Sequence, residues 1–374
     1  MAKPHFISFK TPKRDLALRE KGRGARSNAT GRYESETRER SDEDWDNLPE
    51  RDKTVCKTTV TMERPRKIIN RVNSPYVGFD RSINPYRGCE HGCIYCFARP
   101  THAYHGLSAG LDFETKLFAK PDGPKLLREE LSNPRYKVRT IAIGTNMDAY
   151  QPIERQLRLT RSILRVLAEF NHPVSLLTKS NLIMRDIDIL APMAEKNQTR
   201  CMISITTQDR GLARAMEPRC PTPERRFEAL EKLASSGIRT GIMLGPMIPG
   251  LNDSELESIM TRAAELGASY SAYTILRLPL EVSPLFQEWL DAFAPNRAKR
   301  IMNHIRTMNG GKDYDPAWSR GKEIRTPFAQ LIAQRYRASQ KRTGIDQLRS
   351  GNPLNASLFR VPSSVSGQGD LFEG

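Results

Sequence analysis

The stretch Asn84-Pro-Tyr-Arg-Gly-Cys-Glu-His-Gly-Cys-Ile-Tyr-Cys-Phe-Ala-Arg99 decides the interpretation of this chain. It places Cys89, Cys93 and Cys96 at C-x3-C-x2-C spacing. Three thiolates so close in sequence can hold three corners of a [4Fe-4S] cube and leave the fourth iron without a protein ligand. That open iron is able to bind a second cofactor. The chain has six cysteines in 374 residues, so chance is a poor explanation for the spacing.

A zinc site is the alternative explanation for the same cysteines. Cysteine and histidine at short spacing also suit zinc, and the nearby histidines His91, His102 and His105 would complete its ligand set. Zinc sites usually combine paired C-x2-C halves rather than a group of three cysteines. The spacing therefore favours the iron-sulfur interpretation.

Length and apolar patterning indicate one main domain with extensions, in a cytoplasmic protein. A chain of 374 residues fits one barrel with tails. It has no apolar run long enough to span a membrane, and Met1-Ala-Lys-Pro-His-Phe6 lacks the apolar core of a signal peptide. Cys56, Cys201 and Cys220 are scattered and are interpreted as free thiols in a reducing compartment.

The charge of the chain favours a polyanionic partner, with nucleic acid first. The formal net charge is +16 and the pI is near 9.7. Neutralising phosphates with Lys and Arg releases condensed counterions and gives salt-dependent affinity. Residues 1–32 carry nine Lys or Arg against Asp15 and Glu20. The alternative is that this basic segment only keeps the protein soluble.

Strand-like apolar runs alternate with segments of helical period through the middle of the chain. The amphipathic stretch Ile153–Phe170 predicts one helix that Pro173 would end, and Thr222–Ser236 predicts another that begins at a cap and ends before Gly237. Together with a strand leading into Cys89, the runs make about six β/α units and imply a parallel sheet. The runs are Val138–Gly144, Pro173–Lys179, Arg200–Thr206, Ile238–Leu244 and Ser269–Leu276.

Composition divides the chain into four parts. Residues 1–57 are polar and Arg-rich without apolar periodicity, which predicts a largely disordered arm. Residues 58–310 form the predicted catalytic core and 311–337 a helical extension. Residues 338–374 gather Ser, Gly and Asn and are predicted to be a flexible tail.

With Tyr95 at the aromatic position, the cysteine motif resembles the C-x3-C-x-aromatic-C signature of the radical S-adenosylmethionine (SAM) enzymes. The resemblance implies a partial (β/α)6 TIM-like barrel with its chemistry at the carboxyl ends of the strands. It also implies that the open iron chelates the amino and carboxylate groups of SAM. An external donor of the flavodoxin or ferredoxin type would supply the electron that cleaves SAM to a 5′-deoxyadenosyl radical.

The same resemblance assigns SAM contacts to the ends of the first three strands. The backbone carbonyl of Tyr95 would read the adenine amino group. Gly144, Thr145 and Asn146 stand where the superfamily holds the SAM amino group. Lys179, at the end of the third strand, would reach the ribose or the carboxylate; the alternative is a solvated strand-end charge.

The fourth strand and the segment after it supply the remaining candidates. Ser204 and Thr206 occupy alternate positions and so share one face of the sheet. Arg214 and Glu217, with Arg219, would bind a carboxylate, a ribose or a substrate phosphate. A surface salt-bridge network is the competing interpretation.

Four motifs resemble the group related to spore photoproduct lyase, often called DNA repair photolyase, over about residues 70–280. They are Asn84-Pro-Tyr-Arg-Gly-Cys89, Thr178-Lys-Ser180, Glu217-Pro-Arg219 and Gly245-Pro-Met-Ile-Pro-Gly-Leu-Asn-Asp253. The lyase returns a hydrogen through a cysteine in the loop after the second strand, where this chain has Thr145-Asn-Met-Asp148. The cofactor chemistry is therefore carried over, but not the substrate. Cys201 lies at the wrong end of its strand to replace that cysteine, and Cys220 has no visible activating partner in the sequence.

The last residues, Gln368-Gly-Asp-Leu-Phe372, resemble the peptide by which bacterial replication and repair proteins bind the sliding clamp. An extended tail could bury Leu371 and Phe372 in a pocket while Gln368 forms a hydrogen bond at its rim. Gly369 departs from the commoner leucine. Clamp binding is a hypothesis that capture by a purified clamp would test.

These observations predict a radical SAM enzyme acting on nucleic acid, similar to a DNA repair lyase. One alternative is radical modification of a protein or small molecule. A second is a non-catalytic DNA-binding scaffold with a zinc or inert cluster. Salt-sensitive nucleic-acid binding separates the first prediction from the first alternative, and SAM turnover separates both enzymes from the scaffold.

Overall fold

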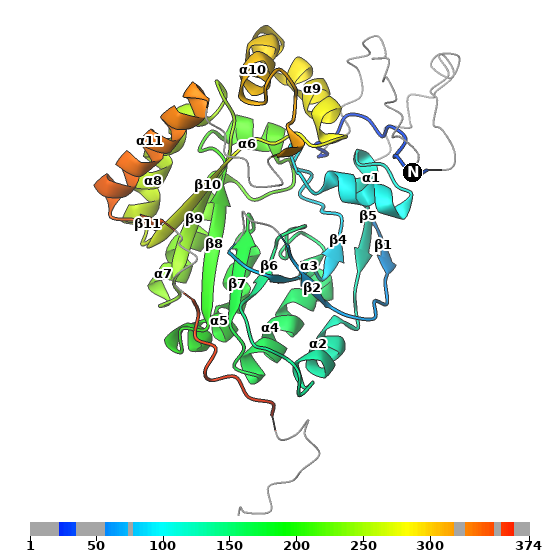
Figure 1. Cartoon of the computed structure of the whole chain (residues 1–374), viewed down its shortest axis with the longest axis vertical. Helices are drawn as coiled ribbons and strands as arrows, with labels where there is room; N and C mark the ends of the chain where they lie inside the picture. The colour runs from blue at the N-terminus through cyan, green and yellow to red at the C-terminus, as the bar shows by residue number, and fades with distance from the viewer. Residues whose placement is uncertain (1–21, 35–56, 74–77, 318–325, 348–352, 363–374) are drawn as a thin grey trace, which may run out of the picture.

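The computed structural model describes residues 22–34, 57–73, 78–317, 326–347 and 353–362. In these residues a mostly parallel sheet forms the centre of the molecule (Figure 1). Its order is β11-β10-β9-β8-β7-β6-β3-β2, and every neighbouring pair is parallel except β2 with β3. The strands are β2 (Ile69–Arg71), β3 (Arg81–Ile83), β6 (Ile141–Ile143), β7 (Val174–Thr178), β8 (Thr199–Ile205), β9 (Thr240–Met247), β10 (Tyr270–Ile275) and β11 (Asp346–Gln347).

Helices follow these strands, as a parallel sheet requires. This arrangement confirms the predicted α/β fold, and each of the five predicted apolar runs overlaps a strand. The helices around the sheet are α2 (Gly123–Leu131), α3 (Glu154–Leu157), α4 (Leu159–Glu169), α5 (Ile187–Glu195), α6 (Arg210–Met216), α7 (Pro223–Ser235), α8 (Leu256–Glu265) and α11 (Pro327–Thr343). The shorter helical turns are η3 (Asn181–Asp186) and η4 (Asp253–Glu255), and α9 (Val282–Phe293) and α10 (Pro295–Met308) pack against each other at one end (Figure 1).

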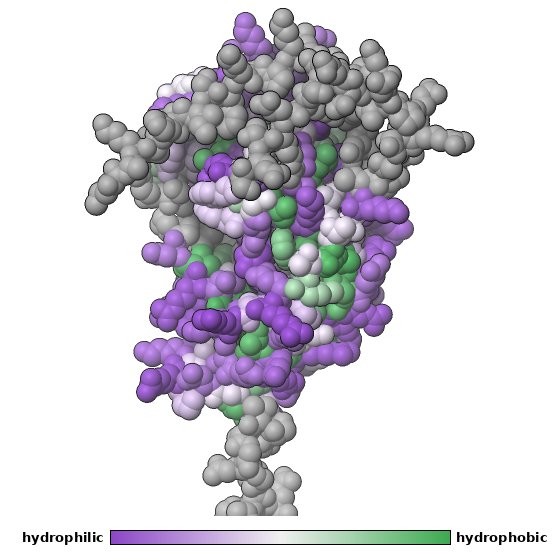
Figure 2. All heavy atoms as spheres, turned by 90° about the vertical axis from the view of Figure 1, so that its right-hand side faces the viewer, coloured by the Kyte–Doolittle hydropathy of each residue, from purple (hydrophilic) through white to green (hydrophobic). Residues whose placement is uncertain are grey.

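A second, small sheet flanks the cysteine motif. It has the order β1-β5-β4, formed by β1 (Thr59–Met62), β5 (Lys116–Ala119) and β4 (Tyr86–Arg87). The cysteine loop, residues 88–98, runs from the end of β4 to η2 (Arg99–His105), and α1 (Leu111–Thr115) leads back into β5. Figure 2 shows the side of the molecule that carries β1, β5 and α1, where hydrophobic side chains gather among hydrophilic ones.

The single helix predicted over Ile153–Phe170 is wrong, because the structure divides it into α3 and α4. Arg158 lies between them with a φ of 52°. The buried Glu154 carboxylate causes the break, since it accepts hydrogen bonds from the backbone N–H groups of Thr160 at 3.0 Å and Arg161 at 3.3 Å. It thereby caps the second helix from inside the first.

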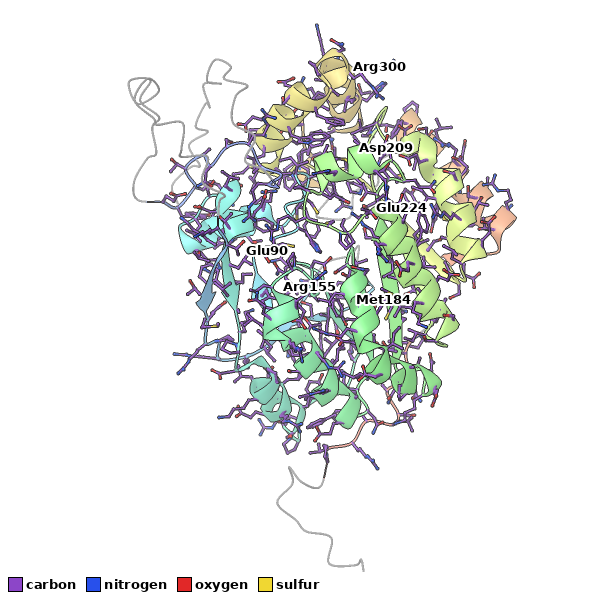
Figure 3. The ribbon with its side chains drawn as sticks, turned by 180° about the vertical axis from the view of Figure 1, so that it is seen from behind. Glu90, Arg155, Met184, Asp209, Glu224 and Arg300 are labelled. Atoms are coloured by element: carbon purple, nitrogen blue, oxygen red, sulfur yellow. The ribbon has the colours of Figure 1, made fainter. Side chains whose placement is uncertain are left out.

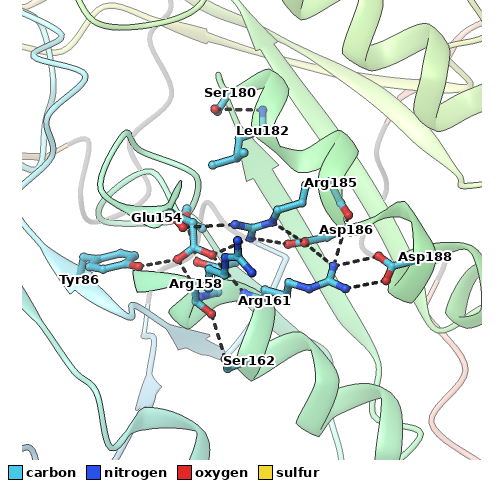
Figure 4. Close-up of polar contacts among 12 residues, drawn as sticks. Tyr86, Glu154, Arg158, Arg161, Ser162, Ser180, Leu182, Arg185, Asp186 and Asp188 are labelled. Carbon is cyan, nitrogen blue, oxygen red and sulfur yellow. Dashed lines mark hydrogen bonds and ion pairs between the residues drawn. The ribbon is translucent and has the colours of Figure 1, made fainter. Parts of the chain in front are cut away.

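A network of charged side chains joins this helix break to the neighbouring elements (Figure 4). Glu154 also accepts from the Tyr86 hydroxyl and from Arg185, at 2.7 Å. Arg185 and Arg161 both pair with the buried Asp186 at 2.8 Å. Because the buried carboxylates each have an arginine partner, the network satisfies its charges while linking β4, α4 and η3.

Residues 22–34, part of the segment 1–57 that was predicted to be a largely disordered arm, have a defined structure. This segment packs against α1, where the backbone N–H groups of Gly24 and Ala25 donate to the buried Glu114 carboxylate at 2.9 and 2.8 Å. Arg23 donates to the Glu114 carbonyl at 3.0 Å. The segment is held by backbone groups bound to a carboxylate rather than by an apolar face, so it leaves no periodic signal in the sequence.

Parts of the segment 338–374, which was predicted to be a flexible tail, also have a defined structure. Helix α11 continues to Thr343, and residues 353–362 lie along the end of the sheet where β7 begins. There the Arg360 N–H donates to the Phe170 carbonyl at 3.1 Å, and the Phe359 ring packs beside His172. The clamp-like residues Gln368, Leu371 and Phe372 lie outside the described residues, so clamp binding stays a prediction.

None of the helices in the described ranges combines the length and the apolar character that a bilayer crossing needs.

Candidate functional site

The cysteine loop is held in one shape by buried hydrogen bonds. Arg99 is fully buried and donates to the carbonyls of Cys93 at 3.0 Å and Gly92 at 3.2 Å, and to the Glu114 carboxylate at 2.5 Å. Gly92 has a φ of 66°, and a Cβ there would lie 2.6 Å from the Glu114 carboxylate. The loop therefore needs glycine at this position, and its backbone is fixed by the same carboxylate that holds residues 24 and 25.

Two chain segments approach the site from opposite sides. Figure 3 shows Glu90 of the cysteine loop on one side of the molecule and Asp209 and Glu224, at the starts of α6 and α7, on the other. Backbone hydrogen bonds join the two segments directly. The Ile94 N–H donates to the Met216 carbonyl at 3.0 Å, and the Arg219 N–H donates to the His91 carbonyl at 3.3 Å.

The three thiols of the loop differ in burial and in the groups around them. Cys89 and Cys93 are buried and Cys96 is half-buried. Burial, together with the neighbouring Cys93 and Cys89, raises the pKa of Cys96 to about 12. Cys93 lies 3.8 Å from the Cys220 thiol, and this hydrogen bond lowers the pKa of Cys93 to about 7.

This donor set fits an iron-sulfur cube better than a zinc ion. A cube takes one thiolate for each iron, so its cysteines need not converge on a single point. Over the described ranges, no three Cys, His, Asp or Glu side chains converge to hold one metal ion. Of the histidines considered for zinc, His91 lies 3.3 Å from Asp148, and His102 Nε2 lies 2.9 Å from the Lys116 carbonyl.

A buried ion pair lies beside the thiols at the ends of β7 and β8. Glu217 pairs with Arg226 of α7, and it also accepts from Thr206 at 2.6 Å and from the Tyr95 hydroxyl. Burial opposes the charged form of Glu217, but Arg226 and Lys179 outweigh it and lower the pKa of Glu217 to about 2. The carboxylate is therefore ionised at neutral pH.

Lys179 places a second positive charge next to this group. Its Nζ lies 5.8 Å from the centre of the Tyr95 ring. Burial opposes protonation, yet Cys93 and Glu217 raise the pKa of Lys179 above its usual value. A protonated amine thus lies close to the cysteine loop. Arg226 is a second positive charge near it and opposes its protonation.

The structure brings together Tyr95, Lys179, Thr206 and Glu217 with the three cysteines. Ser204 is buried nearby and contributes its carbonyl, which accepts from Arg226 at 3.3 Å. Arg214 instead lies exposed on α6, whereas Glu217 at the end of that helix is buried. The competing interpretation of residues 214–219 was a salt-bridge network on the surface. The structure instead has Glu217 in a buried ion pair with Arg226.

Thr145 and Asn146 contact the start of the cysteine motif. The Thr145 hydroxyl lies 3.4 Å from the Asn84 side-chain oxygen, and the Asn146 N–H donates to the same oxygen at 3.3 Å. Asn84 thus ties the end of β6 to the segment that leads into the cysteine loop. The next residues continue this link, since Asp148 pairs with His91.

Gly144 is required by the packing of neighbouring strands. Its φ is 90°, and a Cβ there would lie 2.0 Å from the Leu177 carbonyl oxygen of β7. We expect Gly144→Ala to lower the free energy of unfolding by about 3 kcal/mol, from backbone strain and the clash together. Gly237→Ala is the matched control, because Gly237 has a φ of 75° but no atom within 4 Å of its added Cβ. Urea unfolding that gives equal losses for both variants would contradict the role of the clash.

Sequence reasoning missed three residues of this site. Arg226 occupies a buried position of an amphipathic helix, where its charge gave no sign of an inward partner. Cys220 was set aside for want of a partner, and its contact with Cys93 spans 127 residues of sequence. Asn252 donates to the carbonyls of Thr206 at 2.7 Å and Pro246 at 2.9 Å, and so joins the ends of β8 and β9. These roles follow from three-dimensional contacts that the sequence pattern does not show.

Comparison with known proteins finds relatives that align with this chain over most of their own length. The family model described as the radical SAM superfamily matches residues 83–263. An uncharacterised protein of Mycobacterium tuberculosis is 32% identical over 298 residues, covering 79% of this chain and 86% of the relative. An uncharacterised protein of Methanocaldococcus jannaschii is 29% identical over 247 residues, covering 66% of this chain and 88% of the relative.

Solved structures share the fold at low sequence identity. A point mutant of spore photoproduct lyase superposes with a TM-score of 0.54 at 16% identity, covering 78% of this chain and 82% of the lyase. A doubly substituted form with bound AdoMet and dinucleoside spore photoproduct gives a TM-score of 0.53 at 14% identity, with the same coverage. At such identities the likeness concerns the fold alone.

Proposed function

Because the chain belongs to the radical SAM superfamily, whose enzymes use a [4Fe-4S] cluster and SAM, we propose that it is a radical enzyme that acts on nucleic acid in a repair-like reaction. The observation that carries the proposal is the rigid cysteine loop beside a buried group of opposite charges. When bound, the cluster supplies the electron that cleaves SAM and so yields the 5′-deoxyadenosyl radical. The electron comes from an external donor of the flavodoxin or ferredoxin type.

In this proposal Cys89, Cys93 and Cys96 hold the cluster. The support is chemical: three thiols that interact electrostatically lie on a loop whose backbone is fixed by Arg99 and Glu114. The low pKa of Cys93 favours the thiolate, which is the ligating form. The Cys220 sulfur lies 3.8 Å from the Cys93 sulfur.

Lys179 and the strand ends are proposed to bind SAM. An ammonium that stays protonated suits the SAM carboxylate, and Glu217 fixes the ring of Tyr95 below it through the hydroxyl. The Tyr95 carbonyl would accept from the adenine, and Gly144, Thr145 and Asn146 would hold the SAM amino group. Ser204 lies in β8 and Thr206 directly follows that strand. The exposed position of Arg214 suits a substrate phosphate.

Charge supports a nucleic-acid substrate. The chain carries a net charge of +16, and the spore photoproduct lyase of matching fold has been solved with a dinucleoside lesion. The loop at residues 145–148 has no cysteine, so repair of spore photoproduct itself is not proposed. The substrate class is nucleic acid with a modified or damaged base.

We expect wild-type protein to bind a short oligonucleotide with an affinity that falls about a hundredfold between 50 and 200 mM salt, as roughly four phosphate contacts require. Fluorescence anisotropy across a salt series measures this slope. Chloride and glutamate salts at equal cation concentration control for anion effects. Affinity that does not change with salt, together with unimpaired SAM cleavage, would instead favour a protein or small-molecule substrate.

A further inference from the structure

Two tyrosines stack on the surface beside the cysteine loop instead of being buried. The ring centres of Tyr33 and Tyr104 lie 5.6 Å apart with planes inclined by 22°. Their exposed fractions are 59% and 69%, although large aromatic side chains usually gain most from burial. The Arg32 guanidinium lies over both rings, 5.4 Å from Tyr33 and 5.9 Å from Tyr104. We call Arg32, Tyr33 and Tyr104 the aromatic platform.

Hydrogen bonds hold the segment that carries Arg32 and Tyr33 against η2 and α1. Tyr104 belongs to η2, which directly follows that loop. Residues 27–32 are tied down alongside it, since Leu111 N–H donates to the Ser27 carbonyl at 3.3 Å and Arg32 donates to the Pro100 carbonyl at 3.3 Å. Two rings from segments about seventy residues apart are thus set in place before any partner binds.

Further exposed apolar side chains lie on the same segments. Phe97, directly after Cys96, is 60% exposed, and Met62 at the end of β1 is 54% exposed. The described surface has nine large exposed hydrophobic side chains, and four of them come from the segment 22–34, the small sheet, the cysteine loop and η2. Phe97 thus adds an exposed ring on the cysteine loop itself.

The charge of the platform is balanced locally. Arg32 pairs with Glu281 at 2.5 Å, so its guanidinium adds little net attraction for phosphates. The platform consists of two exposed flat rings with a planar guanidinium over them. Such a surface suits the face of a nucleobase, while the net positive charge of the chain serves the phosphates.

We propose that the aromatic platform stacks an unpaired base of the nucleic-acid substrate next to the cysteine loop. This inference rests on the proposed function and narrows its substrate to single-stranded or locally unpaired nucleic acid. A base inside an intact duplex is already stacked on both of its faces, so neither face is free to stack on the tyrosines. The platform therefore holds a base near the site once that base has left its helix.

The test compares the Tyr33→Ala/Tyr104→Ala variant with wild type, using a fluorescein-labelled oligothymidylate of roughly ten nucleotides, a length within the usual span of single-strand sites. We expect Kd to rise about fivefold or more, since stacking on an aromatic side chain is worth roughly 1–3 kcal/mol per base. The slope of log Kd against log salt should stay unchanged, because no charge is removed. Binding of a blunt duplex of the same length should also stay unchanged.

Two variants serve as controls. Tyr33→Phe/Tyr104→Phe keeps both rings and should restore wild-type Kd. Phe293→Ala removes a 43% exposed ring from α9, where it stacks on Trp289, and should leave Kd unchanged. Equal Kd for wild type and the alanine variant would overturn the platform but leave the proposed function standing. Loss of duplex binding in parallel, or a changed salt slope, would also overturn it, and absence of any oligonucleotide binding by wild type would overturn both proposals.

Discussion

Replacing Cys93 and Cys220 together with alanine is expected to abolish cluster binding, and with it SAM cleavage. Cys93 is a proposed cluster ligand, and Cys220 lies 3.8 Å from its sulfur, so Cys220 is the thiol best placed to substitute when Cys93 alone is changed. After anaerobic reconstitution, iron per protein should fall to the level of a cysteine-free background. Formation of 5′-deoxyadenosine should fall to that of a sample without enzyme.

The remaining cysteines supply the controls for this result. Cys201→Ala removes a thiol buried in β8, away from the loop, and should retain full iron content. Cys220→Ala alone should keep the cluster if three cysteines suffice. A double variant that still binds four irons and cleaves SAM would show that the cluster is held elsewhere.

Replacing Arg226 with methionine should cause the largest loss of stability of any single charge change at the site. Arg226 is 1% exposed and donates to Glu217, to the Pro221 carbonyl at 2.9 Å and to the Ser204 carbonyl at 3.3 Å. Methionine replaces the apolar stem of the arginine side chain but leaves Glu217 buried without its closest cation. Removing one partner of a buried pair costs about 3–5 kcal/mol, and urea unfolding should show a loss of that size.

A neighbouring arginine and a double variant isolate the cause. Arg225→Met removes an exposed arginine that pairs with Glu228 on the same helix, and the urea midpoint should hardly move. Adding Glu217→Gln to Arg226→Met removes the uncompensated charge and should recover part of the lost stability. If the double variant is less stable than Arg226→Met, the carboxylate is not the source of the loss.

Period and spacing predicted the sheet and the cysteine motif because both depend on residues near one another in sequence. The alternation of apolar strands and helices placed β6 to β10, and C-x3-C-x2-C placed the thiols. The break at Arg158 escaped prediction, because a single buried carboxylate, Glu154, imposes it on an otherwise continuous helical pattern. Local propensity does not register such a cap.

Long-range polar contacts explain the other differences. Residues 22–34 lack apolar period, yet they are ordered by Glu114, some ninety residues away, through backbone hydrogen bonds. Cys220 enters the site by a contact with Cys93, which is 127 residues away, whereas Arg226 pairs with Glu217 only nine residues away but in the interior, where its helix pattern gave no sign of a partner. The site residues that motifs could supply were therefore those on the loop and strand ends, while the residues that orient them required the structure.

The most direct test of the central claim is anaerobic reconstitution with iron and sulfide, followed by reduction in the presence of SAM and an oligonucleotide and quantitation of 5′-deoxyadenosine. The control is the variant in which Cys89, Cys93 and Cys96 are all alanine. We predict 5′-deoxyadenosine from wild type only, together with a cluster that the control lacks. A wild-type protein that takes up zinc but no iron-sulfur cluster, or that forms the cluster and leaves SAM intact, would contradict the account.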